Sequence, residues 1–242
     1  MKINTDGLII KKGSVGENDR LVTVLTRDLG VIRAFVHGAN KVKGKTVSAT
    51  DALCYSKFTV TKNRDTYTVS EVTPVEVFFD LRKDIERLSL AQYFCEVAMH
   101  LAVEGEGAEE PLRLILNCLY LLMKQSRPLT QIKAIYELRM MSLAGFMPDL
   151  SGCAACGVED MPCGWFSYTE GVVKCDACGA GGTLISGGVL AAMRHIVGCD
   201  FERLFAFEMP PKALKALGAV TERYLITHCD CSFTALNFYK SL

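Results

Sequence analysis

The first 80 residues alternate between hydrophobic and polar positions in short runs, a pattern typical of β-strands. The runs are rich in Val, Ile, Thr, Tyr and Phe, and turn-forming residues such as Gly16 and Gly30 separate them. The pattern predicts strands at residues 8–11, 21–26, 31–36, 53–60 and 66–72. Five strands at this spacing indicate a small closed barrel. The OB-fold and the SH3-like barrel are the candidates, and we favour the OB-fold because it matches the strand count and recurs as an oligonucleotide platform.

Beyond this strand region, apolar residues recur at intervals of three and four, which is typical of helices. One predicted helix face consists of Ile132, Ile135, Tyr136, Met140 and Leu143. Residues 112–123 are apolar nearly all round, so we expect a buried central helix there. Ser186 is suited to cap a helix over residues 189–197, and Pro211 is suited to open a last long helix through His228.

Two Cys-x-x-Cys pairs separated by 18 residues form the strongest motif in the sequence. The four cysteines are Cys153, Cys156, Cys175 and Cys178. Two residues between thiols allow a tight turn to present both sulfurs to one tetrahedral ion, and the loop length is typical of four-cysteine zinc fingers. Four thiolates fill the coordination sphere, so we expect a structural zinc ion without an open position for water. Cys163 belongs to neither Cys-x-x-Cys pair, so we do not expect it to bind the ion. The alternative interpretation is that the four cysteines are core residues that bind no metal.

These elements predict a multidomain architecture in which a β-barrel precedes helices. Residues 1–80 would form an OB-fold β-barrel that binds nucleic acid. An all-α domain would follow in two parts, at residues 81–150 and 183–242. The embedded four-cysteine zinc finger, at residues 151–182, would be inserted between these two parts.

The chain carries 27 basic and 27 acidic residues, but the charge is distributed unevenly. From residue 33 to residue 64 there are seven basic side chains and one acidic side chain, Asp51, so the net charge is 7 − 1 = +6. Such a positive segment attracts polyanions, and we predict that its basic side chains contact DNA phosphates. They are Arg33, Lys41, Lys43, Lys45, Lys57, Lys62 and Arg64. The alternative is a solvated basic loop without a partner.

Aromatic residues interleave with this basic segment. They are Phe35, Tyr55, Phe58 and Tyr67. Cations combined with exposed rings hold single-stranded nucleic acid by phosphate neutralisation and base stacking. We expect at least half of these rings to fill the barrel core instead.

No motif in the sequence requires an active site. Gly44-Lys45-Thr46 resembles the end of a nucleotide-binding loop, but Ala39 stands where the first glycine of that motif belongs. The four histidines are dispersed and form no His-Glu-x-x-His pair. We therefore expect a binding protein and not an enzyme. An RNA-binding OB-fold protein with a zinc ribbon and a nucleotide-dependent enzyme are the alternatives.

The sequence also indicates where the protein resides. Its longest apolar run, residues 114–123, covers ten residues, whereas a membrane span needs about 20. Residues 8–10 form the only apolar cluster before Lys11, which is too short for a secretory signal. Eleven cysteines, an odd number, favour free thiols in a reducing compartment. We expect a cytoplasmic protein.

Three stretches of the chain resemble the family of the bacterial recombination mediator and DNA repair protein RecO. They are residues 16–41, which begin with Gly-Glu-Asn-Asp-Arg, residues 136–153, which contain Gly-Phe-Met-Pro-Asp-Leu, and the last long helix, which contains Tyr224 and His228. The resemblance spans nearly the whole chain.

This resemblance implies an N-terminal OB-fold and a helical C-terminal domain with an embedded zinc finger. It also implies binding to single- and double-stranded DNA and annealing of complementary strands. The implied partners are RecR and single-strand-binding protein, with which the chain would help to load the recombinase. Such a protein would be associated with the nucleoid in the cytoplasm.

Overall fold

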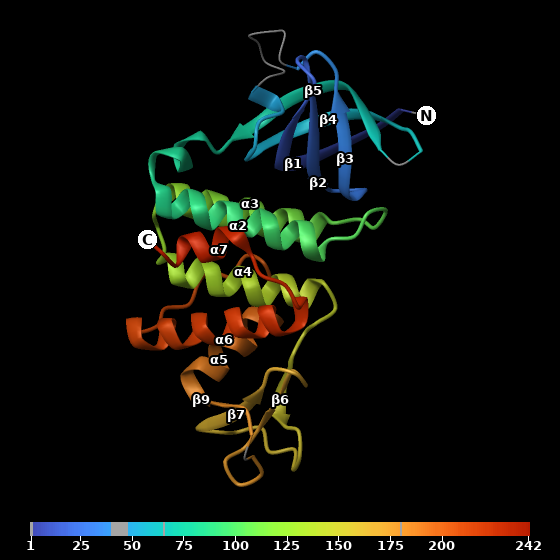
Figure 1. Ribbon diagram of the computed structural model, residues 1–242. Helices are drawn as coiled ribbons and strands as arrows, with labels where there is room; N and C mark the ends of the chain where they lie inside the picture. Colours follow the sequence, from blue (N-terminus) through green and yellow to red (C-terminus); the bar gives the residue numbers. More distant parts are fainter. Residues whose placement is uncertain (1, 40–47, 65, 180) are drawn as a thin grey trace. The chain divides into compact units, whose positions relative to one another are not determined.

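The N-terminal part of the computed structural model is built from five β-strands (Figure 1). The structure describes residues 2–39, 48–64, 66–179 and 181–242. The strands are β1 (Lys2–Val15), β2 (Asp19–Thr26), β3 (Gly30–Val36), β4 (Cys54–Lys62) and β5 (Tyr67–Val77). Each predicted strand is present, and β1 and β5 are longer than predicted because neighbouring strands pair with them along their whole length.

The five strands close into a barrel in the order β1-β2-β3-β5-β4. Strand β1 closes the barrel because it has a neighbour on each side: Ile3 pairs with Val60 of β4, and Lys11 pairs with Thr23 of β2. Neighbouring strands are antiparallel except β3 and β5, which pair in parallel at Ala34. Successive residues of each strand therefore point alternately into the barrel and out of it.

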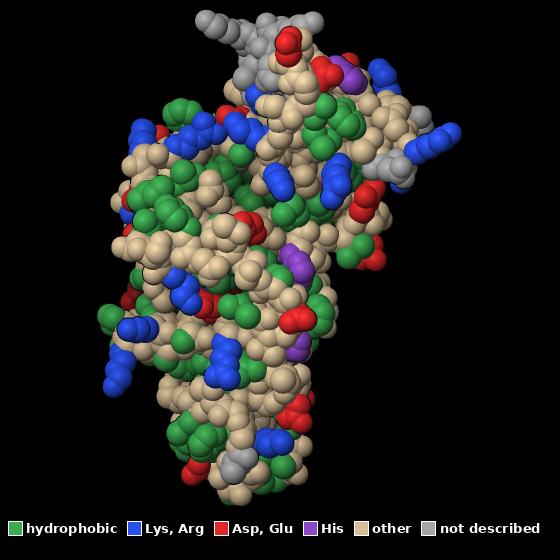
Figure 2. All heavy atoms as spheres, in the orientation of Figure 1, with side chains coloured by type: hydrophobic (Ala, Val, Ile, Leu, Met, Phe, Trp, Pro, Cys, Tyr) green, Lys and Arg blue, Asp and Glu red, His purple; other side chains and the backbone are tan. Residues whose placement is uncertain are grey.

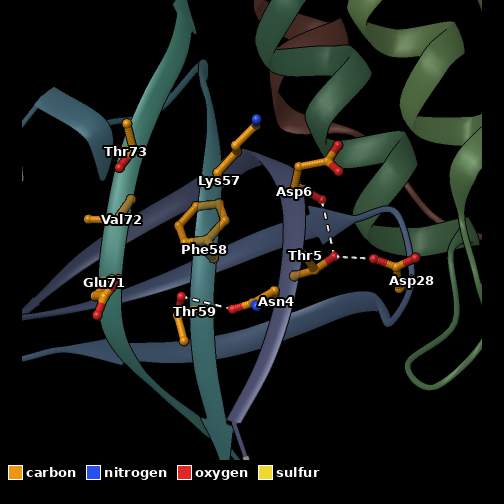
Figure 3. Close-up of a pocket in the computed structure, with 10 residues that line it drawn as sticks. All are labelled: Asn4, Thr5, Asp6, Asp28, Lys57, Phe58, Thr59, Glu71, Val72 and Thr73. Carbon is orange, nitrogen blue, oxygen red and sulfur yellow. Dashed lines mark hydrogen bonds between the residues drawn. The ribbon is translucent and has the colours of Figure 1, made fainter.

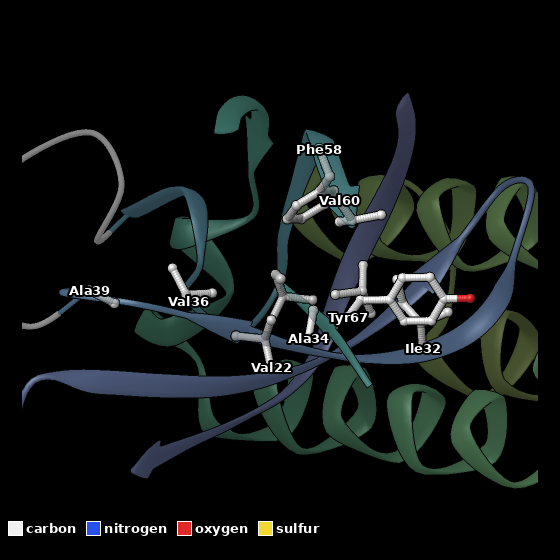
Figure 4. Close-up of a cluster of buried hydrophobic side chains, with 10 residues drawn as sticks. Val22, Ile32, Ala34, Val36, Ala39, Phe58, Val60 and Tyr67 are labelled. Carbon is white, nitrogen blue, oxygen red and sulfur yellow. The ribbon is translucent and has the colours of Figure 1, made fainter. Parts of the chain in front are cut away.

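The barrel interior is filled by hydrophobic side chains (Figure 4). The core residues are Ile9, Val22, Val24, Ile32, Ala34, Val36, Ala39, Phe58, Val60 and Tyr67. Full burial of one such aliphatic or aromatic side chain contributes about 1.5–3 kcal/mol to stability. The intervening residues of β2 and β3, such as Thr23 and Arg33, are directed to the outer face.

The chain groups into two compact units. Unit 1 comprises Met1–Gln125 and Phe233–Leu242, and unit 2 comprises Ser126–Ser232. This grouping reflects which residues pack together. The division predicted from the sequence, at residues 80, 150 and 182, instead reflects a change in the type of secondary structure. That division remains a prediction.

Unit 1 adds helical segments to the barrel. They are the 3₁₀ helix η1 (Phe79–Lys83) and the α-helices α2 (Ile85–Leu101), α3 (Glu109–Lys124) and α7 (Thr234–Tyr239). Asp84 begins α2, because its carboxylate accepts hydrogen bonds from the backbone N–H groups of Glu86 and Arg87. Such a cap satisfies donors that have no partner within the helix.

Helix α7 packs against α2 although more than 130 residues separate them in the sequence. The backbone N–H of Ala235 donates a hydrogen bond to the Glu96 carboxylate at 3.0 Å. The Phe233 ring meets the rings of Tyr93 and His100 edge-on, with centroids 5.5 and 6.1 Å apart. These contacts complete the hydrophobic interior of unit 1 with a segment from late in the chain.

The turn between β2 and β3 joins the barrel to the loop between α2 and α3. Gly30 has a φ of +66°, and a Cβ atom there would lie 1.8 Å from the Val103 carbonyl oxygen. Backbone N–H groups of this loop donate to the turn, from Gly105 to Leu29 at 2.9 Å and from Ala108 to Arg27 at 2.8 Å. Only glycine permits so close an approach of the two backbones.

Unit 2 combines helices with a small sheet. Its elements are α4 (Leu129–Leu143), β6 (Asp149–Cys153), β7 (Cys163–Ser167), β8 (Val172–Lys174), β9 (Thr183–Ser186), α5 (Gly187–Gly198) and α6 (Pro211–Cys229). The sheet has the strand order β6-β8-β7-β9. As predicted, Ser186 caps α5, since its hydroxyl accepts from the Val189 N–H, and Pro211 opens α6.

The helix that is buried nearly all round is α4 and not, as expected, the helix over residues 112–123. That segment lies in α3, where Tyr120 is 52% exposed and Arg113 also faces solvent. Helix α4 buries ten residues, including the charged side chains of Lys133 and Glu137. The sequence did not predict the burial of α4 because Lys133 and Glu137 are charged, and charged residues usually lie on an exposed helix face.

An ion network allows α4 to bury its charges. The Lys133 Nζ atom lies 2.7 Å from Glu137 and 2.8 Å from Glu222 of α6. Thr221 of α6 donates a hydrogen bond to the second Glu137 oxygen at 2.7 Å. Burial alone would lower the pKa of Lys133, but the charges of the two carboxylates raise it overall. The lysine therefore stays protonated.

No helix in the described parts of the chain is long and apolar enough to span a membrane. Helix α6 has 19 residues but carries Lys212, Lys215, Glu222 and Arg223. This result agrees with the short apolar runs of the sequence.

We expect Glu137→Leu to lower the free energy of unfolding by about 3–5 kcal/mol, because it removes one carboxylate from a buried lysine. The double change Lys133→Met with Glu137→Leu should cost less than this single change, because it also removes the buried lysine and leaves only Glu222, which is partly exposed. Urea denaturation measures both effects.

The control for this experiment is Asp80→Asn, which breaks the exposed pair between Lys83 and Asp80. Exposed pairs contribute at most about 1 kcal/mol, so this variant should unfold nearly as the parent does. An equally small effect of Glu137→Leu would show that the buried network does not stabilise unit 2.

Candidate metal centre and nucleic-acid interface

The four cysteines of the two Cys-x-x-Cys pairs come together in unit 2. Cys153 ends β6 and Cys156 follows it, whereas Cys175 and Cys178 follow β8. Their Sγ atoms all lie within 4.8 Å of one another, and those of Cys156 and Cys175 are 3.7 Å apart. Sulfurs bound tetrahedrally at about 2.3 Å from zinc would be about 3.8 Å apart. The group could therefore hold a single metal ion, and its one short sulfur–sulfur distance matches tetrahedral spacing.

Tight turns position these thiols. The N–H of Gly157 donates to the Cys153 carbonyl at 2.8 Å, and the N–H of Gly179 donates to the Cys175 carbonyl at 2.9 Å. Gly157 has a φ of +75°, a conformation that favours glycine. The N–H of Cys175 also donates to the Cys153 sulfur at 3.2 Å. A hydrogen bond of this kind stabilises the thiolate, which is the form that binds metal.

Crowding affects the protonation of the thiols. The pKa of Cys153 is lowered to about 6, chiefly because the backbone N–H of Cys175 donates to its sulfur. The pKa of Cys178 is raised to about 12 by hydrogen bonds with Cys156 and then with Cys175. The four adjacent thiols therefore do not all lose their protons readily when no cation lies among them. A cation among them would remove this restriction, because metal binding displaces the protons.

The donor set of this group consists of sulfur alone. Soft thiolates in tetrahedral geometry suit zinc, so the residues fit a structural metal ion whose sphere is closed to water. Cys163 begins β7 opposite Ser186 and is not part of the four-thiol group. The Trp165 indole N–H donates to Asp176 at 3.1 Å and ties the second cysteine pair to β7.

The seven basic residues predicted to bind DNA have different surroundings. Lys41, Lys43 and Lys45 lie outside the described residues, as does the whole Gly44-Lys45-Thr46 sequence. Arg33 is exposed on β3 and Lys57 is exposed on β4. The other two, Lys62 and Arg64, lie where β4 ends and the turn to β5 begins.

Lys57 lies in an acidic cleft of about 440 Å³ (Figure 3). The other charged residues that line it are Asp6, Asp28 and Glu71, so the charge of the lining is 1 − 3 = −2. Burial alone would raise the pKa of Asp6, but hydrogen bonds from Arg27 and nearby positive charges, Lys57 included, lower it overall. Arg27 forms an ion pair with Asp6 at 3.0 Å, so the unbalanced acidic charge near Lys57 comes from Asp28 and Glu71. These carboxylates weaken the attraction of Lys57 for phosphate.

Lys62 and Arg64 leave their charges accessible to solvent. The Lys62 Nζ atom lies 5.6 Å from the centre of the Tyr67 ring, within the range of a cation–π contact. A backbone hydrogen bond of 2.8 Å from Asn63 to Thr66 closes the turn in which Arg64 is exposed. Both cations can therefore meet a phosphate at this turn.

A second cleft of unit 1, of about 550 Å³, has the opposite charge. Its charged lining residues are Lys11, Lys12, Arg33 and Glu104, which sum to 3 − 1 = +2. It is bounded by the outer face of β1, β2 and β3 and by residues at the end of α2, including Met99. Figure 2 shows hydrophobic and basic side chains near one another on this part of the surface.

Sequence reasoning missed the contribution of β1 to this positive cleft. Lys11 and Lys12 precede the basic segment, so a charge count from residue 33 to residue 64 omits them. Strand pairing nevertheless aligns Lys11 with Thr23, and Thr23 with Arg33. Lys12 instead forms an ion pair with Asp51, which Arg82 also contacts at 3.0 Å.

The four aromatic residues divide as expected between core and surface. Phe58 and Tyr67 are buried in the barrel core. Tyr55 is half-buried, and its hydroxyl donates a hydrogen bond to Asp6. Phe35 is half-buried on the outer face of β3, next to the positive cleft.

Comparison with known proteins places the chain in a family. Residues 1–78 match the family model described as recombination protein O N terminal, and residues 82–234 match that described as recombination protein O C terminal. A DNA repair protein RecO of Acetivibrio thermocellus is 35% identical over 99% of this chain and 97% of its own length. A second, from Alkaliphilus metalliredigens, is 29% identical over the full length of both chains. These matches confirm the resemblance read from the sequence, and the chain belongs to the RecO family.

Proposed function

We propose that this chain is a DNA-binding recombination mediator in DNA repair. It would bind single- and double-stranded DNA without sequence specificity and anneal complementary strands. It would also help to load a recombinase on DNA coated with single-strand-binding protein. The observation that carries this proposal is the match to the RecO family along nearly the whole chain.

Within this proposal the barrel is an OB-fold. Its long first strand is shared between β2 and β4, and β3 and β5 pair in parallel, which supports an OB-fold over an SH3-like barrel. OB-folds commonly bind oligonucleotides on one face of the barrel. The positive cleft with Lys11 and Arg33 supports such a role for the outer face of β1–β3.

Phosphate neutralisation would explain annealing without catalysis by an active site. Two single strands repel each other, and cations that bind their phosphates reduce this repulsion. Contacts to phosphate fix the position of a strand but carry no information about its sequence. A protein that binds in this way can therefore bring any two complementary strands together.

Two protein partners complete the proposal. RecR binding is inferred from the family. The helical part would bind the acidic, apolar-ended tail of single-strand-binding protein. An apolar groove of about 720 Å³ in unit 2, lined by Leu184, Ala216 and Val220 with Lys212 and Arg223, supports this second role. Its two cations match the charge of such a tail.

We further propose that the metal is zinc, at one ion per chain, held by Cys153, Cys156, Cys175 and Cys178. Changing any one of the four to Ser should abolish metal binding, as measured by elemental analysis of the purified protein. Because binding of structural zinc contributes roughly 10–16 kcal/mol to local folding, the sheet β6–β9 should unfold without it. Unit 1 should remain folded.

The matched control for the zinc site is Cys163→Ser, which changes a cysteine of the same sheet that lies outside the four-thiol group. This variant should retain its zinc. If Cys163→Ser lost zinc as completely as Cys175→Ser, the assignment of ligands would be wrong.

The proposed phosphate contacts can be counted from the salt dependence of binding. The logarithm of the single-strand binding constant should fall with the logarithm of salt concentration by about 0.7 per contact. Replacing Lys41, Lys43 and Lys45 together by Ala should flatten this slope by about 2 for every DNA sequence alike. Lys57→Ala should change the slope less, because acidic neighbours surround that lysine.

An unchanged affinity and slope in the triple variant would contradict a role of residues 41–45 in DNA binding. The same variant should keep its zinc and its thermal stability, because it changes none of the metal ligands and none of the described core residues. Parallel titrations with RNA of the same sequence would separate a DNA mediator from an RNA-binding protein.

The partner proposal is tested by mixing the chain with RecR from the same organism. We expect a complex at micromolar concentrations in size-exclusion chromatography. Failure to form any complex, with both proteins folded, would count against the role as a mediator.

A further inference from the structure

Arg194 of α5 holds the loop of the first cysteine pair at both of its ends. Its Nε atom donates a hydrogen bond to the Leu150 carbonyl at 2.6 Å. Its Nη2 atom donates to the carbonyls of Ser151 at 3.1 Å and Glu159 at 3.0 Å. Leu150 and Ser151 precede the first cysteine pair in the sequence, and Glu159 follows it. A planar guanidinium, with several donors in a fixed arrangement, is suited to bridging carbonyls in this way.

The same loop is tied to itself and to the strand that leads to the second cysteine pair. The Cys153 N–H donates to the Val158 carbonyl at 2.8 Å, which closes the loop. The Ala154 N–H donates to the Val173 carbonyl of β8 at 2.9 Å. Whatever orders the cysteines therefore also orders the carbonyls that Arg194 binds.

The start of α5 is fixed to the segment between the two cysteine pairs. The Gly187 N–H donates to the Pro162 carbonyl at 2.8 Å, and a Cβ atom at Gly187 would lie 2.7 Å from that oxygen. Ser186, which caps α5, pairs with Cys163 of β7. The position of α5 and of the end of β9 thus depends on the segment that the cysteines enclose.

Strand β9 and helix α5 contribute one wall of the apolar groove of unit 2. Leu184 and Ile185 of β9 and Val189 of α5 line the groove on this side. Helix α6 contributes the other wall, which includes Ala216 and Val220. The groove therefore requires the sheet and α6 to keep their places relative to each other.

Aromatic contacts join the two walls. The Arg223 guanidinium of α6 lies 4.5 Å from the centre of the Tyr168 ring, which follows β7. The rings of Phe166 and Tyr224 lie 5.4 Å apart between the sheet and α6. Lys212 also lines the groove, so its lining combines apolar side chains with two cations. This chemistry fits an acidic peptide that carries apolar residues.

We propose that the groove binds an acidic peptide only when the metal ion is in place, and that Arg194 is the positioning residue that links the two sites. Zinc and the peptide both belong to the proposed function, on which this coupling rests. Because binding of structural zinc is coupled to local folding, its loss releases the first cysteine loop. Arg194 then loses the carbonyls that fix α5 to this loop, and the wall that includes Leu184 and Val189 loses its support.

The first test compares the full-length zinc-bound chain with the same chain stripped of zinc by a chelator under reducing conditions. The probe is a fluorescent peptide of aspartates that ends in Leu-Phe, and fluorescence anisotropy measures its affinity. Removal of zinc should weaken binding roughly 10- to 150-fold, as expected when a contact equivalent to one buried leucine is lost. Adding zinc back should restore the affinity. By reciprocity, saturating peptide should raise the affinity for zinc by the same factor.

The second test changes the link and leaves the four thiols intact. Arg194→Met should lower the affinity for zinc about 10- to 100-fold, which is typical for residues that orient metal ligands. Competition with a chromophoric chelator measures this affinity. At limiting zinc the variant should also bind less peptide, and excess zinc should restore peptide binding. Such a rescue separates a positioning role from a general loss of the fold.

Two control variants isolate the parts of the coupling. Arg203→Met removes an exposed arginine that follows α5 in the same unit, and both affinities should stay as in the parent. Leu184→Ser changes the groove wall at a side chain that is 52% exposed, so the chain should still fold. This variant should weaken peptide binding, whereas its affinity for zinc in the absence of peptide should not change.

The outcomes separate the coupling from the proposals beneath it. If the zinc-free chain binds the peptide as the parent does, the coupling is wrong, although the zinc site and the groove both stand. If Arg194→Met keeps the zinc and peptide affinities of the parent, Arg194 is not the link. If the purified parent holds no zinc or binds no peptide, the proposed function fails at that point and the coupling fails with it.

Discussion

An irregularity in β1 determines which of its side chains lie in line with Arg33. Leu8, Ile9 and Ile10 are all buried, but only Ile9 belongs to the hydrophobic core of the barrel. The pairing with β2 shifts register between Ile9 and Lys11, so Ile10 is the extra residue of a β-bulge. Without it every later residue of β1 would change faces, and Lys11 would not lie in line with Arg33. The alignment of Lys11 with Arg33 in the positive cleft therefore depends on this bulge.

Closure of the barrel also divides the basic segment between surfaces of opposite charge. Arg33 lies beside Lys11 in a positive cleft, whereas Lys57 lies among Asp6, Asp28 and Glu71 in a negative one. A sum of charges along the sequence could not anticipate this division, because the acidic residues come from β1, a turn and β5. The strands themselves could be predicted, since alternation of apolar residues is a local property.

The same distinction applies to unit 2. The grouping of the four cysteines could be read from the sequence because each pair is local and its spacing follows from the geometry of a turn. The burial of α4 could not be predicted from the sequence. It requires an ion pair from Glu222 of α6 to Lys133 and a hydrogen bond from Thr221 of α6 to Glu137. Two features could not be predicted because they depend on contacts between residues distant in the sequence. They are the distribution of charge over the barrel surface and the burial of α4.

The packing of α7 against α2 has a consequence for the order in which the protein is made. Ribosomes release a chain from its N-terminus, so the barrel, α2 and α3 emerge before unit 2, and α7 emerges after it. Until then Tyr93 and His100 lack Phe233, and Glu96 lacks the N–H of Ala235. Unit 2, which is continuous in the sequence, can fold while unit 1 is still incomplete. The first residues synthesised therefore belong to the unit that is completed last.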